Sequence, residues 1–127
     1  MNHAPMRAPA YFILAALFDG PLHGYGIIKH AEELSAGQVS LAAGTLYAAL
    51  DRLSEAGLVT AEREEIVNGR ARRYYALTDS GEAVLREEAQ RLAAAANVVI
   101  GRRRRRPTLR SVTGPALRAA NATVRLA

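Results

Sequence analysis

The sequence predicts a mainly α-helical chain with one small β-hairpin. Three observations support this fold class. Apolar residues recur at the helical period between 44 and 55. Two segments rich in β-forming residues, 58–64 and 72–77, follow and are separated by an Asn-Gly turn signal. A longer helical pattern then runs from 78 to 100. We therefore expect a short helical domain, a hairpin and a long C-terminal helix, in that order.

Composition limits what the chain can be. Its 127 residues suffice for one domain with a small core. It has no cysteine, which excludes disulfides, zinc–thiolate sites and thiol nucleophiles. The first residues lack the charge pattern of a signal peptide, and the apolar run 10–18 is too short to cross a bilayer. We expect a cytoplasmic protein with no membrane partner.

The net charge of +5 is unevenly distributed. Residues 1–100 hold nine lysines and arginines against twelve acids, a net charge of −3. Residues 101–127 hold eight arginines and no acid, a net charge of +8. The basic character of the whole chain is therefore no evidence that the folded part binds nucleic acid. Only the local placement of charge can provide such evidence.

The first two helices should form the start of the core. Residues 1–9 contain two prolines and no periodicity, which predicts a flexible arm. The apolar run 11–18 predicts a buried helix that ends at Asp19-Gly20-Pro21. A second helix is expected at 25–34, with an inward stripe formed by Ile27, Ile28, Ala31 and Leu34. Tyr25 and Lys29 face outward and could meet a phosphate, or simply solvent.

The third helix has an outward surface suited to a groove. Leu46, Leu50 and Leu53 form its inward face, and Gly57 is placed to end it. Its outer surface begins with small side chains, which would let the helix lie deep in a groove with its N–H groups near phosphate. Ser40 or Thr45 could cap its N-terminus. An ordinary surface helix explains the same pattern equally well. The outer and flanking residues are Gly44, Thr45, Tyr47, Ala48, Asp51, Arg52 and Glu55.

The hairpin carries three arginines within four residues. Residues 65–71 are expected to form its loop, and Val39 or Leu41 could add a very short third strand. Arg70, Arg72 and Arg73 lie at or beside the tip, where they can reach a phosphate backbone or a minor groove. They could instead neutralise acids across the hairpin, which suits Arg73 better than Arg70. A helix followed by an arginine-tipped hairpin is the order in which a winged helix-turn-helix meets DNA.

The last helix predicts self-association. Thr78 or Asp79 can cap its N-terminus. Apolar residues then recur with 4-3-4-3 spacing over two heptads, at Leu85, Ala89, Leu92, Ala96 and Val99. This seam can pack on its own domain or pair with a second copy, and a helix this short is unstable alone. We therefore expect a homodimer, whose two third helices would lie about 34 Å apart and read a palindromic operator.

Three motifs together resemble the PadR-like transcriptional regulators: HGYGI at 23–27, GTLYAALDRLSEAGLV at 44–59 and GRARRYYALTDSGEAVL at 69–85. The resemblance covers residues 10–98. It implies a dimeric DNA-binding repressor whose C-terminal helices dimerise, with Thr45, Tyr47, Arg70 and Arg72 at the DNA. The candidate DNA-binding residues are Tyr25, Ser40, Gly44, Thr45, Tyr47, Arg52, Gly69, Arg70 and Arg72.

The predicted organisation is an arm at 1–9, a winged helix-turn-helix at 10–77, a dimerisation helix at 78–100 and an arginine-rich, disordered tail at 101–127. The tail is either an unspecific clamp on DNA or a solvated segment with no required role.

The resemblance also allows a small-molecule effector at the dimer interface. The chain has no tryptophan to stack on one. Tyr11, Phe12, Leu92 and Val99 are candidate pocket walls, or plain core residues.

Nothing in the sequence favours catalysis. His30 with Glu33 could be a fragment of a metal site, and Asp51 with Glu55 is an exposed carboxylate pair without the burial that shifts a pKa. No phosphate loop or nucleophile motif is present. We expect no enzyme activity, no cofactor and no metal. Two functions remain: a sequence-specific DNA-binding regulator, or a winged-helix module that binds RNA or an acidic protein.

Overall fold

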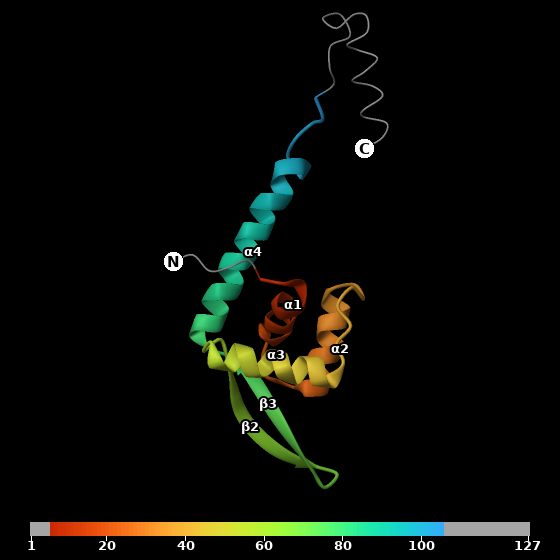
Figure 1. Cartoon of the computed structure of the whole chain (residues 1–127), viewed down its shortest axis with the longest axis vertical. Helices are drawn as coiled ribbons and strands as arrows, with labels where there is room; N and C mark the ends of the chain where they lie inside the picture. Colours follow the sequence, from red (N-terminus) through yellow and green to blue (C-terminus); the bar gives the residue numbers. More distant parts are fainter. Residues whose placement is uncertain (1–5, 106–127) are drawn as a thin grey trace, which may run out of the picture. The chain divides into compact units, whose positions relative to one another are not determined.

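The computed structural model describes residues 6–105 and confirms the predicted fold class, four helices with a small antiparallel sheet (Figure 1). Residue contacts divide the chain into two compact units, Met1–Ala95 and Ala96–Ala127, so the division falls inside the last helix rather than before it. The elements in chain order are α1 (Ala8–Leu17), β1 (Leu22–His23), α2 (Gly24–Leu34), α3 (Ala43–Glu55), β2 (Val59–Val67), β3 (Arg70–Leu77) and α4 (Asp79–Ile100).

Helices α1, α2 and α3 enclose the core. The largest fully buried apolar side chains are Ile13, Leu14, Ile27, Leu46 and Leu50. The predicted inward face of α3 is confirmed, because its three leucines are all buried. The inward stripe of α2 was predicted one residue too long. Leu34 ends that helix, lies beyond its last buried residue and is 44% exposed.

The connection between α2 and α3 is held by a serine. The Ser35 hydroxyl accepts a hydrogen bond from the Val39 N–H at 2.8 Å and donates one to the Glu32 carbonyl at 3.2 Å. This turn directs Val39 and Leu41 into the core, where both are buried. The prediction that one of them forms the third strand was therefore wrong. Their apolar side chains are used for packing.

The start of α3 has no side-chain cap. Ala42 precedes the first helical residue, and no side chain bonds to the free N–H groups there. The expectation that Ser40 or Thr45 caps this helix was wrong, because Ser40 lies two residues before Ala42 and Thr45 already lies within the first turn. The uncapped N–H groups remain available to a ligand.

The wing, defined here as the hairpin of β2 and β3, is longer than predicted. Only Asn68 and Gly69 form its turn, with φ angles of 51° and 75°, and Val67 pairs with Arg70 across it. Two residues with positive φ are the signature of a tight type I′ hairpin turn, which an Asn-Gly pair favours. The expected loop at 65–71 is therefore mostly strand. The sheet has the order β1–β3–β2, and Figure 1 shows the wing projecting beyond the three core helices.

Helix α4 begins against the core. The predicted Thr78 cap is confirmed: its hydroxyl accepts a hydrogen bond from the Gly81 N–H at 3.0 Å and donates one to the Gly57 carbonyl at 2.6 Å. About two turns further on, the buried Glu88 pairs with Arg91 at 2.6 Å and accepts a hydrogen bond from the Met6 backbone N–H at 3.3 Å. Because α1 starts at Ala8 and Met6 packs on the core, the predicted arm is shorter than nine residues.

The apolar seam of α4 has two parts with different surroundings. Leu85 is buried in its own domain and Ala89 is half-buried, so Leu85 is unavailable to a partner. From Gln90 to Ile100 every residue is exposed, including Ala96, with Leu92 at 40% and Val99 at 75%. Dimerisation through this second part remains a prediction. Most of the predicted arginine-rich tail, from Arg106 onward, lies outside the described residues.

Candidate nucleic-acid interface

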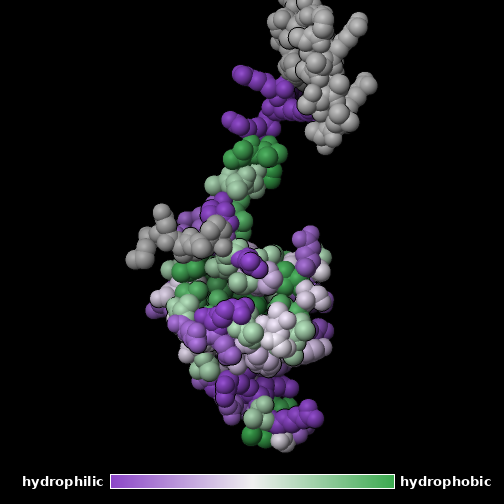
Figure 2. All heavy atoms as spheres, in the orientation of Figure 1, coloured by the Kyte–Doolittle hydropathy of each residue, from purple (hydrophilic) through white to green (hydrophobic). Residues whose placement is uncertain are grey.

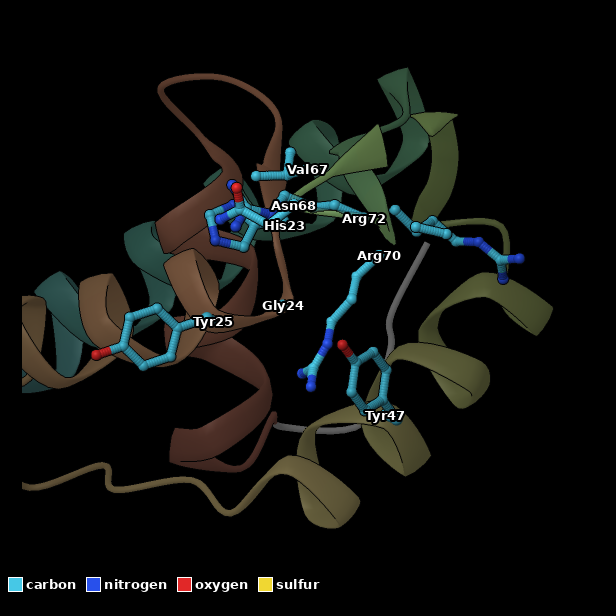
Figure 3. A pocket seen from close by; sticks show the side chains of 10 residues that line it. His23, Gly24, Tyr25, Tyr47, Val67, Asn68, Arg70 and Arg72 are labelled. Carbon is cyan, nitrogen blue, oxygen red and sulfur yellow. The ribbon is translucent and has the colours of Figure 1, made fainter. Parts of the chain in front are cut away.

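A cleft of about 650 Å³ opens between the N-terminus of α2, the first turns of α3 and the wing. Figure 3 shows its lining, with the Arg70 side chain extending from the wing toward Tyr47 on α3. The walls combine cationic, aromatic and small residues from segments far apart in the sequence. They are His23, Gly24, Tyr25, Tyr47, Val67, Asn68, Arg70, Ala71, Arg72 and Arg73.

The short strand β1 joins the wing to α2. Leu22 pairs with Tyr75 and His23 with Tyr74, so the N-terminus of α2 begins directly beside β3. The His23 ring contacts the Tyr74 ring edge-on, with 5.5 Å between centroids. This pairing connects the arginine-bearing strand to the start of the helix. β1 therefore positions one wall of the cleft against the other.

The arginines of the wing fall into two groups. Arg63 binds Glu62 at 3.0 Å and Glu65 at 3.2 Å, and its guanidinium lies 4.2 Å from the centre of the Tyr74 ring. Arg73 binds Glu64 at 3.3 Å, which agrees with the alternative that its charge is neutralised across the hairpin. Arg70 and Arg72, by contrast, form no ion pair with any residue in the range 6–105. Their charges are therefore free to act on an anion in the cleft.

The predicted site residues are partly gathered here. Tyr25, Tyr47, Arg70 and Arg72 line the cleft, and Gly69 forms the turn above it. Gly44 and Thr45 are exposed on the first turn of α3. Ser40, in the linker, and Arg52, two turns along α3, are exposed but do not line the cleft.

Sequence reasoning missed the residues that the fold alone brings in: His23, Gly24, Val67 and Asn68. The HGYGI motif was the only sequence signal for the first two. This motif precedes the helix expected at 25–34, and the strand pairing of His23 with Tyr74 depends on a distant segment that the motif does not indicate.

Gly24 sets the position of the Tyr47 ring. A Cβ added to Gly24 would overlap the Tyr47 hydroxyl, and Tyr47 is 47% exposed. We expect Gly24→Ala to move that ring, which has room to swing outward, and to weaken DNA binding about as much as Tyr47→Ala. Thermal unfolding should change little, because the displaced atoms are the far end of a side chain. Titrating both variants with operator DNA would test this. Equal affinity of Gly24→Ala and wild type would contradict it.

The pKa of His23 is lowered, first by burial and then by the positive charge of Arg72, with Glu65 opposing the shift. At neutral pH the ring is therefore uncharged. A phosphate entering the cleft would stabilise the protonated ring, so DNA affinity should rise as the pH falls into the range where the ring takes up its proton. Titrations at constant ionic strength would show this rise, and His23→Gln should reduce it. A pH dependence identical in the two proteins would contradict the assignment.

The lowered pKa of His23 has the opposite effect on folding: acidification lowers the stability of the free protein. Because the folded-state pKa lies below that of the unfolded chain, the unfolded state binds more protons as the pH falls through 6.5. His23 therefore stabilises the free protein above that pH and less below it. Acidification should weaken the fold slightly while it strengthens DNA binding, which separates the two effects.

No metal centre forms among residues 6–105. His30 lies 3.4 Å from Glu33 and 3.9 Å from Asp19, but the two carboxylates approach different ring nitrogens. They flank the imidazole and do not converge on one point, so this is a surface ion-pair cluster. In the same part of the chain, no helix combines the length and the apolar character that crossing a membrane needs.

Residues 13–87 match the family described as transcriptional regulator PadR-like. The chain belongs to this PadR-like family. Among curated relatives, the transcriptional regulator Rv3488 of Mycobacterium tuberculosis is 38% identical over 101 residues, which cover 80% of this chain and 91% of the relative. The helices, the sheet and the wing described above are also similar to those of solved PadR regulators.

Two solved PadR structures illustrate the match. A PadR family regulator from hypervirulent Clostridium difficile R20291 superposes with a TM-score of 0.63 at 26% identity, covering 75% of this chain and 97% of that one. Bacillus subtilis PadR in complex with operator DNA superposes with a TM-score of 0.57 at 25% identity, covering 95% of this chain and 62% of that one. The predicted PadR-like membership is confirmed.

Proposed function

We propose that this PadR-like regulator is a homodimeric repressor that binds a palindromic operator in double-stranded DNA. The observation that carries the proposal is the pair of uncompensated arginines, Arg70 and Arg72, beside an uncapped and exposed α3 N-terminus. Gly44 and Thr45 enter the major groove with α3, and the arginines meet the adjoining backbone and minor groove. The similarity to Bacillus subtilis PadR, which was solved with operator DNA, supports operator binding. A repressor of this kind acts by binding and needs no catalytic group or cofactor.

The partner for α4 in this proposal is a second copy of the chain. Leu92, Ala96 and Val99 are exposed at seam spacing, and small alanines allow close approach. A two-fold dimer repeats the α3 surface and therefore requires two half-sites. We expect Leu92→Asp with Val99→Asp to give monomers in sedimentation at micromolar concentration, with much weaker operator binding. Retained dimers would exclude this seam.

An effector would have a small apolar groove available. Tyr11, Ala15 and Phe18 of α1 face Leu85, Arg86 and Ala89 of α4 around a space of about 210 Å³. Among the predicted pocket walls, Tyr11 lines this groove, whereas Leu92 and Val99 are exposed farther along α4. A ligand there would touch the helix that pairs the subunits, which is how ligand and DNA binding could be linked.

The test of function is a mobility shift with DNA from upstream of the chain's own coding sequence. We expect a complex with this fragment that survives excess unrelated DNA and weakens steeply with salt. Thr45→Ala should change which sequence is preferred, because this side chain faces the base edges. An equal preference for random DNA or for single-stranded RNA would favour the alternative of an RNA- or protein-binding module.

A further inference from the structure

The free end of the wing carries an exposed apolar side chain. Ile66 is 74% exposed, and it lies one residue before Val67 and the Asn68-Gly69 turn. Figure 2 shows a hydrophobic patch beside strongly hydrophilic atoms at this end of the molecule. The remaining outward positions of β2 near it are charged, at Glu62, Arg63, Glu64 and Glu65.

The strand register fixes which way these residues face. Ile66 pairs with Ala71, and Val67 pairs with Arg70. Because cross-strand partners share a face and neighbours alternate, Ile66 and Ala71 lie on the opposite face of the wing from Val67 and Arg70. The tip therefore has an apolar side chain on each face, Ile66 on one and Val67 on the other, and Arg70 shares the face of Val67.

A single exposed isoleucine is common on protein surfaces and by itself indicates nothing. Two features set Ile66 apart. It lies close to the turn at the free end of the wing and is not part of the hydrophobic core, and it shares this tip with Arg70, which projects from the opposite face. The minor groove is about 6 Å wide and its walls are sugars rather than phosphates, so they present apolar atoms to an inserted tip.

We propose that Ile66 is an apolar contact between the wing and the minor groove of operator DNA. When Arg70 enters the groove, Ile66 packs against the deoxyribose wall on the other side of the tip. This inference rests on the proposed DNA-binding function and adds to it a contact that does not depend on charge. The two kinds of contact differ in one measurable way: removing an ionic contact lowers the salt dependence of binding, whereas removing an apolar contact does not.

The test compares Ile66→Val with Ile66→Thr, two replacements that have nearly the same shape as each other and that both keep the β-branching that strands favour. We expect Ile66→Thr to bind operator DNA about 5-fold more weakly, in line with the loss of a small apolar contact area, and Ile66→Val to bind within about 2-fold of wild type. Plots of log affinity against log salt for all three proteins should be parallel. Thermal unfolding should be unchanged, because the side chain is exposed.

Thr60→Val is the matched control, because Thr60 is exposed on the same strand but lies at the other end of the wing. It should leave affinity unchanged. Three outcomes would each overturn the inference while leaving the proposed function intact: wild-type affinity of Ile66→Thr, a change in its salt slope, or a change in affinity of about the same size from Thr60→Val. Failure of the wild-type protein to bind its upstream DNA would overturn both.

Discussion

Replacing Arg70 and Arg72 together with alanine should lower the affinity for operator DNA about 100-fold at physiological salt. The slope of log affinity against log salt should also become less steep by about 2. For each phosphate contact that is lost, the DNA releases about one counterion fewer when the protein binds. Neither arginine is paired within the described part of the chain, so no ion pair has to be broken before it binds DNA. Fluorescence anisotropy at several salt concentrations measures both quantities.

The matched control is the double replacement of Arg63 and Arg73 with alanine. It removes the same total charge from the same hairpin, but from arginines already held by Glu62, Glu64 and Glu65. We expect a much smaller loss of affinity and little change in slope. If both double variants lose affinity equally, the ion pairs with Glu62, Glu64 and Glu65 would not decide which arginines of the wing bind DNA.

Gly81→Ala should destabilise the fold by about 2 kcal/mol, the range expected for overpacking. A Cβ at this position would overlap the backbone carbonyl of Leu58, which cannot rotate aside as a side chain can. The same carbonyl accepts a hydrogen bond from the Thr78 N–H at 3.1 Å, so moving it disturbs the start of α4 as well. Urea denaturation at fixed protein concentration measures the effect, since a dimer's stability depends on concentration.

Gly44→Ala is the counterpart in α3. A Cβ there would meet nothing within 4 Å, and its backbone is helical. We expect equal or higher stability, by about 0.5–1 kcal/mol, because alanine favours a helix over glycine. DNA affinity should nevertheless fall, because the added methyl group lies on the surface that enters the groove.

For the Gly81 prediction, a Gly81→Ala protein as stable as wild type would contradict the packing assigned to α4.

The parts of this fold that sequence could predict are those governed by local rules. The 3.6-residue period identified the buried leucines of α3, and the Asn-Gly pair identified the hairpin turn. Thr78 was recognisable as a cap because its hydroxyl bonds within one turn. Each of these depends on residues only a few positions apart, and so each could be predicted without knowledge of the tertiary structure.

The parts that sequence could not predict depend on contacts between distant segments. β1 is only two residues long, has no period and becomes a strand only because β3 lies beside it. An apolar heptad does not specify its partner, so the use of Leu85 by its own core was undetermined. The sequence likewise could not show that Glu65 would bind Arg63 and leave Arg72, its partner across the strands, uncompensated. The first of these outcomes positions one wall of the cleft, and the third leaves Arg72 within it without an ion pair to any residue of the range 6–105.

The most direct test of paired α3 helices in the major groove is a chemical footprint of the full-length protein on its upstream DNA. We expect two protected segments whose centres lie about 10 base pairs apart, one turn of the duplex, with guanine N7 protected in the major groove of each. Thr45→Ala should weaken that guanine protection and leave the backbone protection in place. A single unrepeated segment, or even protection along the whole fragment, would contradict the paired arrangement.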